Sequence, residues 1–249
     1  MSSVDSPENR AFAPADPGFL VSIATFAFVA LGLEAVVDGT VLTLTGEIPD
    51  VYPLGWQVVA WLCLGAAWVG VQRGLVAWLR HRAADPAVPL PSAAELSPAV
   101  DHRRTTTALV LFVAAVLLGV ILPVFLVGQW RLQPIQLYLD LYADYGGGAW
   151  LGMVGFAAYH VGRSLLLALV LTCVQRAAEL HRPAPWTRAA PVGGLVLGAL
   201  LALPGLVLGG WASVASAVVC CTLLGLVHNL TGKSLRWTAP AAVVVLLFV

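Results

Sequence analysis

Charged residues are scarce in this sequence. Asp, Glu, Lys and Arg together make up 10% of its 249 residues, whereas a typical soluble domain carries about a quarter. Hydrophobic residues reach 59%, and the mean hydropathy is +0.88. So few polar side chains do not cover the surface of a water-soluble fold. The composition therefore excludes an ordinary soluble domain.

An excess of charge of one sign is also absent, and cysteines are few. Thirteen Lys and Arg balance thirteen Asp and Glu, so we expect no nucleic-acid partner. The four cysteines lie inside apolar runs and form no Cys-x-x-Cys motif, so no metal site is predicted from them. Residues 1–17 lack the basic start of a signal peptide, and we expect the first apolar run to stay in the mature protein. No sequence motif indicates which cofactor, if any, the protein binds, so the cofactor is unknown.

Long apolar runs dominate the sequence. About twenty apolar residues span a membrane core about 30 Å thick. The last run has thirteen residues and reaches only about 20 Å at ~1.5 Å per residue. The sequence predicts an all-α, polytopic integral membrane bundle of six transmembrane helices plus a short C-terminal seventh helix or half-helix. The runs lie near 18–38, 55–79, 106–128, 149–175, 190–210, 211–230 and 237–249.

Composition shifts divide the chain into four parts. A polar tail covers residues 1–17, and a two-helix front segment covers 18–79. Residues 80–105 form a basic-ended linker, rich in Pro and Ala, that buries too little apolar surface to fold as a domain. Residues 106–249 form the main transmembrane bundle.

The positions of the basic residues predict the orientation. With the N-terminus in the cytoplasm, eleven of the thirteen Lys and Arg fall on the cytoplasmic side, which leaves Arg131 outside and Arg163 within a span. This distribution is typical of the positive-inside rule. We therefore expect a multi-pass plasma-membrane protein with residues 39–54 and 129–148 as outer loops. Tryptophans at the predicted span ends support these boundaries: Trp56, Trp130, Trp150 and Trp211 outside, and Trp78, Trp186 and Trp237 inside.

Arg163 is the most informative residue of the fourth span. It lies about 20 Å below Trp150 at ~1.5 Å per residue, and a charge at such depth costs up to ~2.5–3.5 kcal/mol on insertion scales. It is interpreted either as a site for an anionic group or a catalytic electrostatic element, or as part of a structural ion pair. Glu34 is the obvious partner. Its depth depends on whether the first helix ends at Val37 or continues through residues 41–45.

Two histidines lie within the predicted spans. His160 shares a helix face with Arg163, and His228 lies near the polar inner end of the sixth span beside Asn229. Together with Glu34, these histidines are the candidates for acid/base catalysis. Their depths differ by about 10 Å at ~1.5 Å per residue, so a shared metal site is not predicted. We expect Arg163 to point into the bundle, toward Glu34, a backbone carbonyl, or His228 and Asn229.

Small residues recur three or four positions apart along the fifth span, which favours close approach of a neighbouring helix. Pro204 predicts a kink in the same span. The stripe consists of Gly194, Gly198, Ala202, Gly205 and Gly209.

Three features of the last hundred residues stand out together: the long fourth span ending at Gln175–Glu179, Thr231-Gly232-Lys233-Ser234-Leu235 followed by Pro240, and Phe156-x-x-x-His160. In these features the chain resembles the CAAX-protease and bacteriocin-processing family of intramembrane metalloproteases. The family's signature also contains a pair of adjacent glutamates, which this chain lacks, and a late histidine, whereas no histidine follows Pro240. The resemblance therefore implies a degenerate relative without the carboxylate that activates a metal-bound water.

Three functions follow as hypotheses. The first is a noncatalytic, pseudo-protease-like bundle that binds a membrane lipid or a membrane protein. The second is an intramembrane CAAX-protease-like hydrolase that uses His160, Glu34 and His228. The third is a small transporter or permease subunit with Arg163 on its path.

Overall fold

The computed structural model describes residues 16–46, 53–83, 102–128, 133–208 and 210–248. Within these ranges the chain is helical and contains no strand, as the sequence predicts. The elements are α2 (Pro17–Leu31), α3 (Leu33–Thr45), α4 (Leu54–Ala83), α5 (His102–Val127), α6 (Gln133–Tyr145), η3 (Gly146–Gly148), α7 (Ala149–His181), α8 (Pro185–Ala189), α9 (Val192–Leu208), α10 (Trp211–Leu230), α11 (Leu235–Val245) and η4 (Leu246–Phe248).

Five helical segments in the described ranges are long and apolar enough to cross a membrane: Pro17–Thr40, Leu54–Arg82, Arg103–Val127, Pro134–His181 and Trp211–Leu230. These helices lie at five of the six predicted spans. The predicted span at 190–210 forms α9, whose 17 residues reach only about 25 Å at ~1.5 Å per residue. The C-terminal run forms α11 and η4, which are shorter still, as expected.

The first span continues past Val37 and changes direction at Gly32. Helix α2 ends at Leu31 and α3 runs on to Thr45, so the alternative in which the helix includes residues 41–45 is the one observed. Near the bend, the indole Nε1 of Trp68 donates a 2.9 Å hydrogen bond to the carbonyl of Ala30. A side chain that takes over a carbonyl of the helical ladder is a usual companion of a helix bend. The bend places Glu34 beside α7.

The segment 129–148, predicted as an outer loop, contains a helix that the hydropathy pattern does not predict. Helix α6 occupies Gln133–Tyr145, and Leu141 is buried against Gly152 of α7. Four exposed apolar side chains recur at helical spacing along the opposite side: Ile135, Tyr138, Leu139 and Tyr142. Gln and Asp stand between the apolar residues of this segment, so its mean hydropathy is too low for a membrane span. The helical spacing of its apolar residues was therefore not recognised from the sequence.

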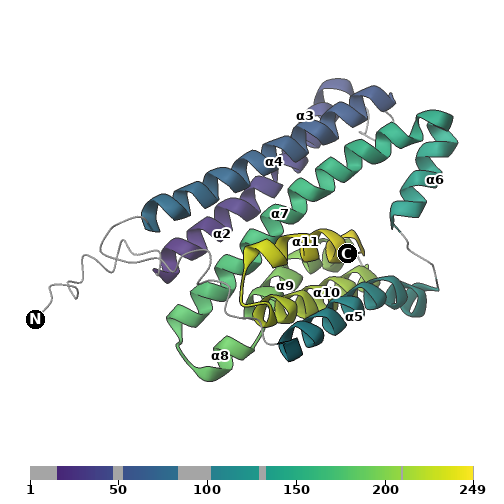
Figure 1. Cartoon of the computed structure of the whole chain (residues 1–249). Helices are drawn as coiled ribbons and strands as arrows, with labels where there is room; N and C mark the ends of the chain where they lie inside the picture. Colours follow the sequence, from purple (N-terminus) through teal and green to yellow (C-terminus); the bar gives the residue numbers. More distant parts are fainter. Residues whose placement is uncertain (1–15, 47–52, 84–101, 129–132, 209, 249) are drawn as a thin grey trace, which may run out of the picture.

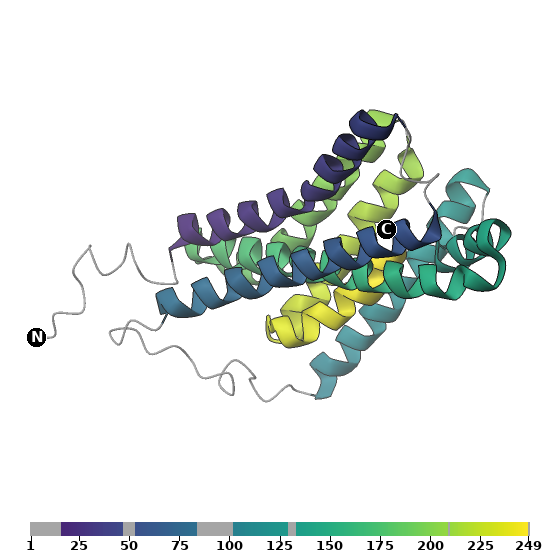
Figure 2. The same ribbon diagram turned by 90° about the horizontal axis from the view of Figure 1, so that it is seen from above.

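Helix α7 is the centre of the molecule (Figure 1). The helices α2 and α4 lie along one side of it, and α5, α9, α10 and α11 lie on the other. Figure 2 shows the same two groups from above. Most buried side chains of α7 fall in its second half, from Ser164 to Glu179. The predicted front segment is thus packed directly on the predicted fourth span.

Small residues let α9 approach α10 closely, as the stripe predicts. A Cβ added to Gly198 would lie 3.0 Å from the Cα of Val218, and one added to Gly205 would lie 2.9 Å from Cγ2 of Val214. Gly194 meets the carbonyl of Cys221 in the same way. Gly209 lies outside the described residues. A backbone-to-backbone contact of this kind is the usual packing of membrane helices at small residues.

The described tryptophans of the predicted belt are exposed at helix ends. They are Trp56, Trp78, Trp150, Trp186, Trp211 and Trp237, while Trp130 lies outside the described residues. Trp68, which belongs to neither predicted layer, is fully buried. An exposed indole at a span end is suited to the headgroup layer.

Candidate functional site

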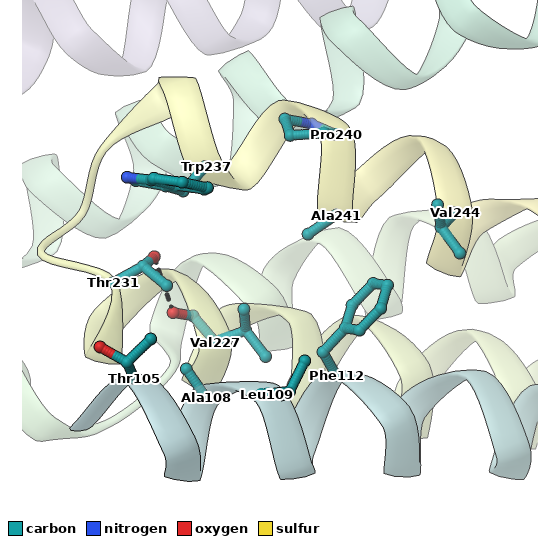
Figure 3. A pocket seen from close by; sticks show the side chains of 10 residues that line it. All are labelled: Thr105, Ala108, Leu109, Phe112, Val227, Thr231, Trp237, Pro240, Ala241 and Val244. Atoms are coloured by element: carbon teal, nitrogen blue, oxygen red, sulfur yellow. Dashed lines mark hydrogen bonds between the residues drawn. The ribbon is translucent and has the colours of Figure 1, made fainter. Parts of the chain in front are cut away.

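An apolar groove lies between α5 and α11, with α10 as its floor (Figure 3). Its volume is about 550 Å³. Ala108 and Ala241 leave the space open because their side chains are small, and Phe112 and Val244 line its inner part. The hydroxyls of Thr105 and Thr231 and the indole nitrogen of Trp237 lie at one end of the groove (Figure 3).

A second, smaller cavity lies inside the bundle around Arg163. It has a volume of about 170 Å³ and combines polar groups of α7 with apolar side chains of α9 and the C-terminus. Arg163 faces this cavity, so its inward orientation agrees with the expectation. A cavity of this size and polarity has room for water molecules. The lining residues are Phe156, Tyr159, His160, Arg163, Ser164, Leu167, Leu201 and Leu246.

Arg163 is linked to Glu34 through Tyr159. The Tyr159 hydroxyl donates a 2.6 Å hydrogen bond to Oε1 of Glu34, and the guanidinium of Arg163 interacts with the same hydroxyl. Within the described residues, Arg163 makes no direct ion pair with a carboxylate. The expected contact with Glu34 is therefore indirect. Tyr159, on the same helix face as Arg163 but one turn away, was not predicted to take part.

His160 binds the backbone of α11. Its Nε2 lies 2.8 Å from the carbonyl oxygen of Val243 and 3.3 Å from Oγ of Ser164. A carbonyl oxygen only accepts, so Nε2 carries a hydrogen and donates it to Val243. This nitrogen then has no free lone pair to take a proton from Ser164. The arrangement holds α11 against α7 rather than activating a nucleophile.

His228 binds α11 at a second point. Its Nδ1 lies 2.6 Å from Oγ1 of Thr238, which donates its own hydrogen to the carbonyl of Ser234 at 2.9 Å. Nδ1 of His228 is consequently the donor of the pair. The two histidines therefore contact α11 five residues apart, at Thr238 and Val243. The described residues contain no cluster of three His, Cys, Asp or Glu that could hold a metal ion.

Polar groups gather at the end of the bundle where α7 ends and α9 begins. Gln175, 1% exposed, donates to Oε1 of Glu179 at 2.8 Å and to the carbonyls of Thr187 and Ala190 at 3.2 Å each. Its own Oε1 accepts from the backbone N–H of Gly193 at 3.0 Å. One side chain of α7 thus bonds the α7–α9 connection at Thr187 and Ala190 and the start of α9 at Gly193. We name Gln175, Glu179 and Lys233 the inner polar cluster.

Lys233 completes the inner polar cluster from the α10–α11 turn. Its Nζ lies 2.6 Å from Oε1 of Glu179. Lys233 has a left-handed backbone with φ of 61°, after Gly232 at 75°, and its N–H donates to the carbonyl of His228 at 2.9 Å. This bond closes the C-terminus of α10 in the manner of a Schellman motif.

Asn229 lies away from Arg163. Its Nδ2 donates to the carbonyls of Ala189 and Ala190, at 3.3 and 3.2 Å. The structure therefore brings Arg163, His160 and, through Tyr159, Glu34 into one region, and places His228 and Asn229 in another. The cluster residues Gln175 and Glu179 were noted only as the end of the fourth span. Their four-residue spacing places both polar side chains on one face of an otherwise apolar helix, and this pattern could have indicated a polar contact.

Comparison of the chain with family models, curated proteins and solved structures finds no match. The resemblance to the CAAX-protease family thus remains a prediction based on the sequence motifs alone.

Proposed function

We propose that this chain is a noncatalytic, multi-pass plasma-membrane protein that binds a membrane lipid, with one acyl chain lying in the groove between α5 and α11. The groove carries the proposal. Its volume of about 550 Å³ falls within the ~300–1,000 Å³ typical of small-molecule sites. A neighbouring helix, with a diameter of ~10–12 Å including side chains, is a poorer fit to this space.

The lining of the groove also suits a lipid. Residue numbers rise in the same direction along α5 and α11, from Thr105 to Phe112 and from Trp237 to Val244 (Figure 3). An acyl chain placed between them runs along both helices. Its ester end then lies beside the Thr105 and Thr231 hydroxyls and the Trp237 indole, a side chain that favours the headgroup layer.

The histidine contacts support a noncatalytic role. His160 and His228 both donate to groups of α11, so they stabilise the helix that forms one wall of the groove. We include in the proposal that the chain is a degenerate relative of the CAAX-protease family in which the histidines hold a helix instead of a metal. The sequence features that support this are the missing glutamate pair and the motifs at Thr231–Pro240.

Filling the groove should remove the bound lipid. We expect the wild-type protein, extracted in mild detergent, to retain phospholipid detectable by native mass spectrometry. Ala241→Phe should lower that occupancy about tenfold, equivalent to ~1.4 kcal/mol, because its ring occupies the groove. Val110→Phe is the matched control, since Val110 is 61% exposed on α5 and does not line the groove. Equal occupancy in the wild type and in Ala241→Phe would contradict the proposal.

The proposed orientation places the N-terminus, residues 80–105, residues 176–189 and residues 233–236 in the cytoplasm, because the basic residues gather there. Reporters that are active in only one compartment, fused at Ser92 and after Gly147, should give opposite signals. The control is a second fusion on each side, at Arg182 and at Gly46. Matching signals at Ser92 and Gly147 would show that the number of spans between them is even.

A further inference from the structure

A basic pocket lies at the end of the bundle where α5 begins and α10 ends. It has a volume of about 640 Å³, and its lining includes Arg104 of α5, Arg188 of α8 and Lys233 of the α10–α11 turn. None of its lining residues is acidic. Its apolar wall is formed by Leu226 and Leu230.

This basic pocket is separate from the groove between α5 and α11. On α10, the groove uses Val227 and Thr231, whereas the pocket uses Leu226 and Leu230. Successive residues of a helix are turned by about 100° from one another, since 3.6 residues make a turn. The two sites therefore lie on different sides of the helix.

The backbone around Arg188 is fixed by hydrogen bonds from three side chains. On one side, the Thr187 hydroxyl bonds to the carbonyls of Arg182 and Ala184 at 2.6 and 2.7 Å. On the other side, Asn229 and Gln175 both donate to the carbonyl of Ala190. The backbone that carries Arg188 is thus preorganised beside the pocket that Arg188 lines.

The pocket carries an excess of positive charge. Of its three lining cations, Lys233 is paired with Glu179. Among the described residues, Arg104 and Arg188 form no ion pair. Within the part of the chain that the structure describes, two of the three cations in this concave site therefore have no acidic partner. Such a site favours an anion, and the planar guanidinium fork suits the oxygens of a phosphate.

We propose that this pocket binds the phosphate group of an anionic ligand, and that its source is the headgroup of an anionic phospholipid. Basic pockets between membrane helices on the cytoplasmic side are suited to such headgroups. Leu226 and Leu230 provide an apolar surface beside the cations for the first carbons of the lipid. The site binds independently of the acyl-chain groove, so either proposal can fail without the other.

The test uses the full chain in nanodiscs made of equal amounts of phosphatidylglycerol and phosphatidylcholine. We expect native mass spectrometry to show about tenfold enrichment of phosphatidylglycerol on the protein. The double variant Arg104→Gln/Arg188→Gln should lose this enrichment. The control Arg80→Gln/Arg176→Gln removes the same charge from exposed residues outside the pocket and should retain it. Thermal unfolding of each variant in the same nanodiscs verifies that it is folded.

A second arm distinguishes the two sources of phosphate. Inorganic phosphate is titrated into delipidated protein in neutral detergent, with thermal unfolding as the readout. Stabilisation by phosphate that is lost in Arg104→Gln/Arg188→Gln, without enrichment of phosphatidylglycerol, would support the phosphate site and assign it to a soluble ligand. Equal enrichment in the wild type, the pocket variant and the control, with no response to phosphate, would overturn the proposal.

Discussion

Gln175→Leu should lower the free energy of unfolding by about 3–5 kcal/mol. Leucine has a similar size, but it leaves the buried N–H of Gly193 and the carbonyl of Thr187 without the amide that satisfies them. The carbonyl of Ala190 keeps its bonds from Asn229 and Val192. Each buried polar group left unpaired costs ~1–3 kcal/mol. The Gln175 side chain is only 1% exposed, so water does not replace the lost bonds.

The measurement is reversible unfolding in mixed detergent micelles, followed by circular dichroism. Thr172→Val is the control, because Thr172 lies one turn earlier on α7 and its hydroxyl bonds only within its own helix, to Ala168. It should cost less than about 1 kcal/mol. A loss for Gln175→Leu no larger than that of Thr172→Val would show that the α7–α9 connection is held by other contacts.

Gly65→Ala should destabilise the protein by about 2–3 kcal/mol relative to Gly70→Ala. A Cβ at Gly65 would lie 2.6 Å from the carbonyl oxygen of Ala158, and backbone atoms of two packed helices cannot move apart locally. Overpacking of this kind costs ~1–3 kcal/mol. At Gly70, five residues along the same helix, nothing lies within 4 Å of the added Cβ. There alanine should be neutral or stabilising by up to ~1 kcal/mol through its helix propensity.

The same unfolding assay compares the two alanine variants directly. Both carry the same chemical change in α4, so the difference isolates the contact with α7. The reciprocal substitution Gly162→Ala should behave like Gly65→Ala, since its Cβ would lie 2.6 Å from the carbonyl oxygen of Gly65. Equal stability of Gly65→Ala and Gly70→Ala would show that α4 and α7 are farther apart than the structure places them.

Part of the candidate site was predictable from the sequence. The depth and helical face of Arg163 predicted an inward orientation, because a charge in hydrocarbon is costly. The link to Glu34 through Tyr159 was not predictable. A sequence gives the angle of each side chain around its own helix, but not the height or rotation of that helix relative to its neighbours. At the bend near Gly32, two residues before Glu34, the carbonyl of Ala30 accepts a hydrogen bond from Trp68 of another helix, a contact that the sequence does not reveal.

The roles of the histidines likewise depended on the packing. His160 and His228 were candidates for acid/base chemistry because the residue type titrates near neutral pH. Their hydrogen bonds to Val243 and Thr238 exist only because α11 packs beside α7 and α10. The helix within the predicted outer loop at 129–148 was missed for a related reason. Helix α6 is amphipathic and packs against α7 through Leu141, a contact that a hydropathy pattern does not show.

The sequence by itself determined the helical class, the positions of five membrane-length helices and the stripe of small residues on α9. These features follow from composition and local spacing, which act within one helix and require no partner. Only the tertiary structure decided which side chains of different helices meet, and so it alone placed Gln175 on the α7–α9 connection and Arg104 beside Arg188. Hydrogen bonds and charge pairs act over a few ångströms, so they depend on how the helices are docked.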